Sequence, residues 1–142
     1  MTAQPHISFE PHNDGSKKFV VDGLDNFNVA TTGCAEYFPV QYFLRGEGDE
    51  VLGGLIGYIW GGWLHVQVLW VAQAARGGGH ARDMMLAAER YAIERGCRHA
   101  HLETFSFQAR PFYEKLGYSV FGELKDYPPG HTEFFMKKTL TG

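Results

Sequence analysis

The alternation of apolar and polar positions predicts a chain of β-strands interrupted by three helices. Apolar residues recur at helical spacing over residues 17–27, and small or apolar residues do so over 79–95. A shorter helix is expected over residues 108–116, where Pro111 fits only in the first turn. Segments rich in aromatic and β-branched residues predict strands at residues 6–10, 37–44, 51–60, 63–71, 99–104, 118–124 and 132–139.

Glycine and polar clusters predict the connections between these elements. The pair Gly61-Gly62 suits a tight hairpin, and the polar residues 46–50 suit the hairpin loop before it. Gly96 and Gly117 each follow a helix and are expected to end it. The order is three antiparallel strands, a helix, a strand, a helix and a closing hairpin. It predicts an α+β fold, with a mixed, mostly antiparallel sheet and flanking helices, in one domain over residues 1–142.

Composition narrows the class of partner. The net charge of −3 at pH 7 leaves no broad basic face, so nucleic acid is not an expected partner. No run approaches the ~20 apolar residues of a membrane span, and the first residues lack the pattern of an export signal. Cys34 and Cys97 are too far apart in sequence for a metal knuckle. We therefore expect two reduced thiols in a cytoplasmic protein.

The segment at residues 76–81, RGGGHA, is a candidate phosphate-binding loop. It follows the predicted strand 63–71 and begins the long helix, where unpaired N–H groups and the helix dipole attract anions. Glycines let a ligand approach the backbone closely. The P-loop pattern fails because His80 and Ala81 follow the last glycine, and the dinucleotide pattern fails because Arg82 stands where a small residue is needed. A loop that only turns the chain is the structural alternative.

Two ordered motifs resemble one family. Arg76-x-x-Gly79-x-Ala81 resembles the acetyl-CoA signature of the GNAT superfamily of N-acetyltransferases, and the FYEKLGY segment at residues 112–118 resembles that family's second conserved helix. The resemblance covers roughly residues 6–140 and implies a GNAT-like acyl-CoA N-acyltransferase fold. The sequence departs from the pattern at His80, a position that is usually apolar, and at Ser106, where relatives often carry an Asn that contacts the cofactor.

This resemblance implies an enzyme that moves an acetyl group from acetyl-CoA to a primary amine of a small molecule or peptide. The amine would attack directly in a ternary complex, and the protein would be a homodimer. A CoA-binding sensor or regulatory module without chemistry is the alternative. The residues expected to hold the cofactor are Leu69, Trp70, Val71, Arg76, Gly77, Gly78, Gly79, His80, Ala81, Ser106 and Tyr113.

Four residues are candidates for proton transfer. Tyr113 matches the family's frequent general acid, which protonates the departing CoA thiolate. A protonated amine must also lose a proton before it attacks, and the candidate bases are His65, Glu103 and His131. His131, in the final hairpin loop, is equally a candidate contact for the acceptor. Strand alternation predicts that His65 shares one face with Gln67 and Leu69.

Other side chains suggest walls for the acceptor rather than chemistry. His99 and His101 alternate on one strand face, but no third ligand follows at suitable spacing, so no metal is expected. Asp126 could attract a cationic acceptor. The candidate walls are Trp60, Trp63, Phe105, Phe107 and Tyr127.

Overall fold

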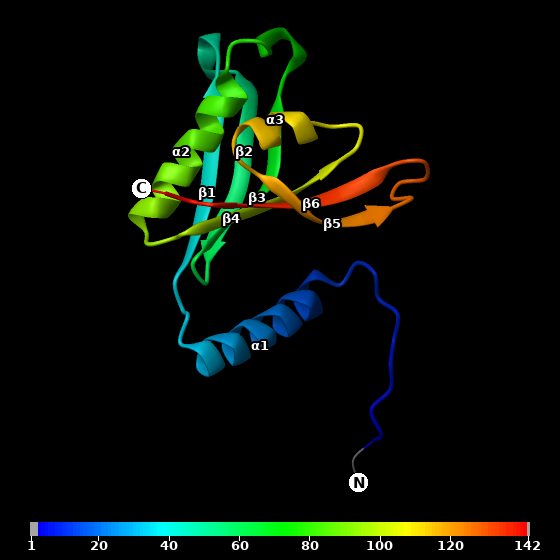
Figure 1. The fold of residues 1–142 in the computed structure, drawn as a ribbon. Helices are drawn as coiled ribbons and strands as arrows, with labels where there is room; N and C mark the ends of the chain where they lie inside the picture. Colours follow the sequence, from blue (N-terminus) through cyan, green and yellow to red (C-terminus); the bar gives the residue numbers. More distant parts are fainter. Residues whose placement is uncertain (1–2, 142) are drawn as a thin grey trace. The chain divides into compact units, whose positions relative to one another are not determined.

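The structure is a computed structural model in which residues 3–141 are described (Figure 1). The chain divides into two compact units, Met1–Ala35 and Glu36–Gly142, and each is described by itself. That residues 1–142 act as one N-acetyltransferase domain stays a prediction. Among the helices of residues 3–141, none combines the length and the apolar character that crossing a membrane would require.

The first unit contains one long helix, α1 (Asp14–Thr32). Its start is fixed by Asn13, whose Oδ1 accepts a hydrogen bond from the Ser16 N–H at 2.9 Å. Its end is fixed by Gly33, which adopts a left-handed φ of 74° and donates its N–H to the Val29 carbonyl at 2.8 Å. The helix predicted over residues 17–27 is confirmed. It extends beyond those residues because its caps, Asn13 and Gly33, lie outside the apolar pattern.

The strand predicted at residues 6–10 is wrong. Residues 3–10 form no strand, although Ile7 and Phe9 alternate as a strand would. A strand needs a neighbour for its N–H and C=O groups, and alternation alone does not supply one. α1 likewise buries none of its residues: Phe19 is 81% exposed and Phe27 is 64% exposed.

The second unit is built on a six-stranded sheet in the order β1-β2-β3-β4-β6-β5 (Figure 1). Every neighbouring pair is antiparallel except β3 and β4, which are parallel. The mixed, mostly antiparallel sheet of the predicted α+β fold is confirmed. The strands are β1 (Tyr37–Arg45), β2 (Val51–Trp60), β3 (Trp63–Val71), β4 (His99–Phe105), β5 (Ser119–Lys125) and β6 (Thr132–Thr139).

The helices of the second unit, α2 (His80–Glu94) and α3 (Arg110–Lys115), lie between successive strands of the chain, and Pro111 falls in the first turn of α3 as expected. Short 3₁₀ turns occupy Glu47–Asp49 and Gln73–Ala75. α2 packs on β1, β2 and β3 through one apolar stripe, so one face of the sheet forms the core. The largest fully buried side chains are Leu55, Leu64, Met85, Leu102, Met136 and Thr104.

One carboxylate is buried in this core. Glu89 of α2 is 6% exposed, accepts a hydrogen bond from the Tyr118 hydroxyl at 2.8 Å and pairs with Lys138 of β6 at 2.7 Å. Burial of a carboxylate is tolerated only with such partners. Glu89 therefore attaches α2 to the β6 side of the sheet, while the apolar stripe of α2 packs on β1, β2 and β3.

The parallel ladder between β3 and β4 is short. It joins residues 63–66 to residues 99–102, after which β3 continues beside β2 alone and β4 continues beside β6. The two central strands therefore part beyond Val66 and Leu102. The β4-facing edge of β3 has no ladder partner there among residues 3–141.

A β-bulge in β3 coincides with this parting. Gly57 of β2 pairs with Val66, whereas Ile56 pairs with Val68, so Gln67 is the extra residue. The bulge reverses the side-chain alternation, and Leu69 packs against the core instead of sharing a face with His65. The face predicted for His65, Gln67 and Leu69 together is therefore wrong.

Gly57 permits the close contact at the bulge, which gives a stability prediction. A Cβ at position 57 would lie 2.2 Å from the His65 carbonyl oxygen, so Gly57→Ala must displace β3. We expect the free energy of unfolding to fall by about 2–3 kcal/mol in a urea titration. The matched control, Gly15→Ala in the first turn of α1, places its Cβ 3.9 Å from Asn13 Oδ1, an ordinary contact, and should not lower the free energy of unfolding. Equal effects of the two changes would contradict this account.

Candidate active site

The glycine loop presents unpaired backbone amides at the start of α2. Gly77 and Gly79 adopt left-handed φ values of 88° and 78°, which only glycine adopts easily. Gly79 caps α2 without a side-chain hydrogen bond. Within residues 3–141, the amides of Gly77, Gly78 and Gly79 donate no hydrogen bond to the protein. The loop therefore has the geometry of an anion site rather than of a closed turn.

A pocket of about 230 Å³ lies against this loop. Arg76 and Arg82 supply positive charge to it, and the Arg76 Nε also donates a hydrogen bond to the Val71 carbonyl at 2.9 Å. The His80 ring folds back against Gly78, where an added Cβ would lie 2.9 Å from its Nε2. The lining residues are Val71, Ala75, Arg76, Gly77, Gly79, His80, Ala81, Arg82 and Phe112.

Three of the predicted cofactor residues follow the bulge in β3. Leu69, Trp70 and Val71 lie on the part of β3 that has separated from β4. Val71 also lines the pocket at the glycine loop, so this strand edge leads directly to that loop.

Tyr113 lies buried in α3. Its ring contacts Phe112 edge-on at 5.1 Å and Tyr118 edge-on at 6.1 Å between centroids. Burial raises the pKa of the Tyr113 hydroxyl to about 12, so the group stays protonated at neutral pH and can donate a hydrogen bond. Phe112, its neighbour in the chain, lines the pocket at the glycine loop.

The candidate bases His65 and Glu103 form a pair. His65 Nε2 lies 2.8 Å from Glu103 Oε2, and the Tyr58 hydroxyl lies 3.2 Å from His65 Nδ1. Parallel pairing sets His65 beside His101, and Glu103 follows two residues later on the same face. The sequence suggested both residues, but it did not indicate that they touch, because that contact depends on the register between β3 and β4.

His101 completes this cluster. Its ring stacks on His65 with centroids 4.1 Å apart, and Trp63 contacts it edge-on at 5.6 Å. Burial lowers the pKa of His101 below its usual value, His65 lowers it further, and Glu103 acts in the opposite direction. The histidine pair considered from the sequence, His99 and His101, is not the group that the fold gathers, because His99 lies outside it. One ligand atom each from His65, His101 and Glu103 lies within 4.8 Å of the others.

His131 and Ser106 meet in a separate group. His131 Nδ1 lies 3.4 Å from Ser106 Oγ, which also accepts a hydrogen bond from the Thr132 N–H at 3.0 Å. His131 packs edge-on against Phe107. Phe107 stacks on Phe105, which in turn contacts Tyr127 edge-on. The hydrogen bonds and ring contacts of His131 thus involve this group rather than the His65–Glu103 pair.

Trp63 and Asp126, which the sequence suggested for acceptor binding, both contact other parts of the protein. Trp63 stacks on His99 at 4.6 Å between ring centroids. Asp126 accepts a hydrogen bond from the Gly130 N–H at 3.0 Å, so its carboxylate helps to shape the loop between β5 and β6.

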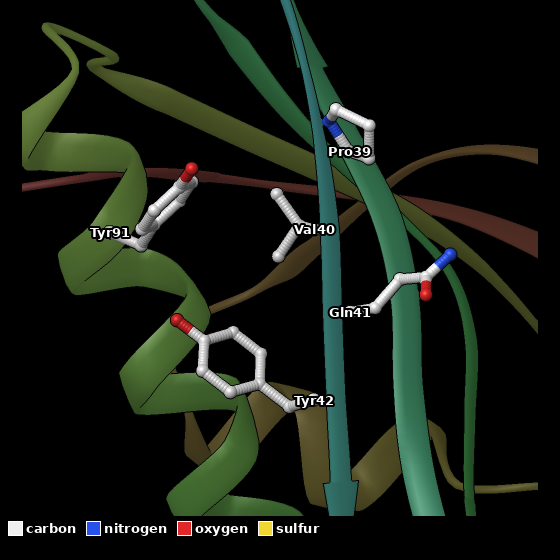
Figure 2. A pocket seen from close by; sticks show the side chains of 5 residues that line it. All are labelled: Pro39, Val40, Gln41, Tyr42 and Tyr91. Atoms are coloured by element: carbon white, nitrogen blue, oxygen red, sulfur yellow. The ribbon is translucent and has the colours of Figure 1, made fainter.

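Another pocket, of about 250 Å³, lies at the edge strand β1 (Figure 2). Val40 and Tyr42 face Tyr91 of α2, whereas Pro39 and Gln41 point to the other side of β1. The Tyr42 hydroxyl donates a hydrogen bond to the Ala87 carbonyl of α2 at 3.3 Å. This pocket lies at the sheet edge and contains none of the residues that the sequence suggested for catalysis or cofactor binding.

The chain matches the model of the Acetyltransferase (GNAT) family over residues 10–118. Blasticidin-S acetyltransferase of Streptomyces morookaense is 43% identical over 113 residues, which are 77% of this chain and 83% of that protein. An acetyltransferase of known structure from Bacillus cereus ATCC 14579 is 29% identical, covers 96% of this chain and 98% of its own, and has a TM-score of 0.83. A Bacillus anthracis structure in complex with acetyl coenzyme A is 18% identical and similar in fold; the match covers 75% of this chain and 65% of that one, with a TM-score of 0.64.

The glycine loop at the start of α2, beside two parting parallel strands, agrees with the GNAT-like fold that the sequence resemblance implied. The family match and the 43% identical relative establish that this chain belongs to the GNAT acetyltransferase family.

Proposed function

We propose that this protein transfers the acetyl group of acetyl-CoA to a primary amine of a small molecule or peptide. The observation that carries the proposal is the set of unpaired Gly77, Gly78 and Gly79 amides beside the edge where β3 leaves β4. Family membership supports acetyl-CoA as the cosubstrate. The proposed reaction uses no metal, and two thiols expected to be reduced favour a cytoplasmic location.

In this proposal the cofactor lies along a path that ends at the glycine loop. The diphosphate binds the loop amides, the first turn of α2 at His80 and Ala81, and the Arg76 guanidinium. The pantetheine arm forms hydrogen bonds with the open edge of β3 at Leu69, Trp70 and Val71, as an added strand would. Ser106, at the end of β4, contacts the same arm.

Glu103 is the group we propose to take the proton from the acceptor amine. Both ring nitrogens of His65 are engaged, one by Glu103 and one by Tyr58, whereas the Glu103 side chain is 29% exposed against 15% for His65. A carboxylate also retains lone pairs after it accepts one hydrogen bond. His65 then positions Glu103 through the contact between its Nε2 and Glu103 Oε2, and the proton taken from the amine is shared between these two side chains. His131 is assigned to acceptor binding, together with the aromatic side chains around it.

The amine nitrogen then attacks the thioester carbonyl carbon, and the C–S bond breaks as the tetrahedral intermediate collapses. Tyr113 donates a hydrogen bond to the departing sulfur. With a pKa of about 12 against ~8.5 for a thiol, the phenol stabilises the thiolate mainly by that hydrogen bond, and solvent can supply the final proton.

The transferase proposal is tested by measuring free thiol released from acetyl-CoA with a panel of primary amines. Blasticidin S belongs in the panel because a 43% identical relative carries that substrate in its name, and a peptide with lysine tests the other acceptor class. We expect turnover with at least one amine. CoA binding without thiol release from any amine would instead support the sensor.

The cofactor site is tested with two variants of one glycine. Asp and Asn have the same shape and both tolerate the left-handed φ of 78° at Gly79, so only charge separates Gly79→Asp from Gly79→Asn. Because a carboxylate would repel the diphosphate, Gly79→Asp should bind CoA about 100-fold more weakly than Gly79→Asn in a calorimetric titration. Equal affinities would place the diphosphate elsewhere.

The role of Tyr113 predicts a separation of turnover from binding. Tyr113→Phe keeps the ring that packs on Phe112 and Tyr118 but removes the hydroxyl. We expect kcat to fall about 10- to 100-fold because a hydrogen bond to a charged group is lost, while the Kd for acetyl-CoA stays within about twofold. Thermal unfolding serves as the control for packing. Unchanged kcat would remove Tyr113 from the mechanism.

We also propose that the protein is a homodimer. Taken by itself, the first unit leaves six large apolar side chains of α1 uncovered, and a contiguous apolar patch is typical of an association surface. They include Phe19, Leu24 and Phe27 on one side of the helix. A second copy of the chain would cover this stripe.

Light scattering during gel filtration tests the dimer. We expect the mass of two chains, and a monomer for the double variant Phe19→Ser with Phe27→Ser, because apolar contacts are removed. The matched control changes Lys18 and Asp25 to Ser on the opposite side of α1 and should remain a dimer. A monomeric wild-type chain would contradict the proposal.

A further inference from the structure

Three potential metal ligands converge on the face of the sheet that α2 and α3 leave uncovered. His65 comes from β3, and His101 and Glu103 come from β4. One ligand atom of each lies within 4.8 Å of the other two. The proposed acetyl transfer uses Glu103 and His65 but not His101, so the cluster has one potential ligand more than that reaction needs.

The strand register produces this convergence. β3 and β4 are parallel and in register, so His65 pairs with His101. Strand alternation returns the Glu103 side chain to the same face two residues later. Because β3 has left β4 at that point, His65 can reach Glu103, and its Nε2 lies 2.8 Å from Oε2.

The donor set and its spacing suit zinc. Two imidazole nitrogens and one carboxylate oxygen form the protein ligands of many zinc sites, where a fourth position stays open. With Zn–N distances of about 2.0–2.1 Å, tetrahedral ligand atoms are about 3.4 Å apart. Ligand atoms that lie within 4.8 Å of one another must come closer by up to about 1.4 Å, and the stacked rings of His65 and His101 must tilt so that their in-plane lone pairs meet at one position.

The surroundings are compatible with an ion. Zinc at His65 Nε2 requires the ring proton on Nδ1, where the Tyr58 hydroxyl oxygen at 3.2 Å can accept it. Lys137 is the register partner of His101, but its ammonium lies over the Phe121 ring, 5.4 Å from the centroid. This contact directs Lys137 toward β5, and Lys137 also lines a pocket of about 490 Å³ with Trp63 and His99.

We propose that His65, His101 and Glu103 bind one Zn²⁺ ion, and that the bound ion inhibits acetyl transfer. The ion would take the lone pairs of Glu103 and His65 that the acceptor proton needs. Inhibition rests on the proposed function, whereas metal binding does not.

Metal binding is measured directly, without acetyl-CoA. Full-length protein treated with EDTA and dialysed is titrated with Co²⁺, whose visible absorption reports tetrahedral nitrogen and oxygen ligands, and then with Zn²⁺ by calorimetry. We expect one saturable site. His101→Ala and Glu103→Gln should each weaken Zn²⁺ binding at least about 100-fold, since each removes a ligand.

His99→Ala is the matched control. His99 lies on the same strand and the same face, stacks on Trp63 and is not part of the three-ligand group. Its Zn²⁺ affinity should stay within about threefold of the wild type. Circular dichroism in EDTA verifies that all variants are folded. Absence of a saturable site, or an equal loss in His99→Ala and His101→Ala, would overturn the proposal.

Inhibition is measured separately, with any amine that the thiol assay identifies. At ten times its Kd, Zn²⁺ should lower turnover about tenfold, and EDTA should restore it. Bound Zn²⁺ with unchanged turnover would overturn the inhibitory role. If no amine is acetylated but Zn²⁺ binds at the three ligands, the transferase proposal fails and the metal site stands.

Discussion

The site depends on how far the hydrogen-bond ladder between β3 and β4 extends. Four residue pairs join the two strands, and beyond them each strand keeps only its outer neighbour. A longer ladder would satisfy the edge of β3 internally and leave nothing for a ligand backbone to bind. A shorter one would separate His65 from Glu103. The same limit therefore creates both the open strand edge and the polar cluster beside it.

Much of the fold follows from local signals in the sequence. Gly61-Gly62, the glycines at 77–79 and the stops at Gly96 and Gly117 fix turns and helix ends through backbone freedom that other residues lack. Those signals are short-range, so the antiparallel strands and the loop could be predicted. The strand expected at residues 6–10 had the correct alternation, but whether a segment finds a strand partner depends on distant parts of the chain.

The candidate site was predictable as a set of residues but not as an arrangement. The bulge at Gln67 has no sequence signal in β3 itself; its mark is Gly57 on the opposite strand, which admits the displaced backbone. The contact between His65 and Glu103 requires the register of a parallel pair. The burial of Tyr113, and hence its raised pKa, requires the packing of α3 against the core.

Glu89 has a mechanical consequence. α2 begins at the glycine loop and packs on β1, β2 and β3. Glu89 of α2 forms hydrogen bonds with Lys138 and Tyr118 on the other half of the sheet. Because α2 is attached to both halves of the sheet, it restrains the two halves from moving apart. Loss of the Glu89 contacts would therefore loosen the separation of β3 and β4 from the core side, without changing any residue of the open β3 edge.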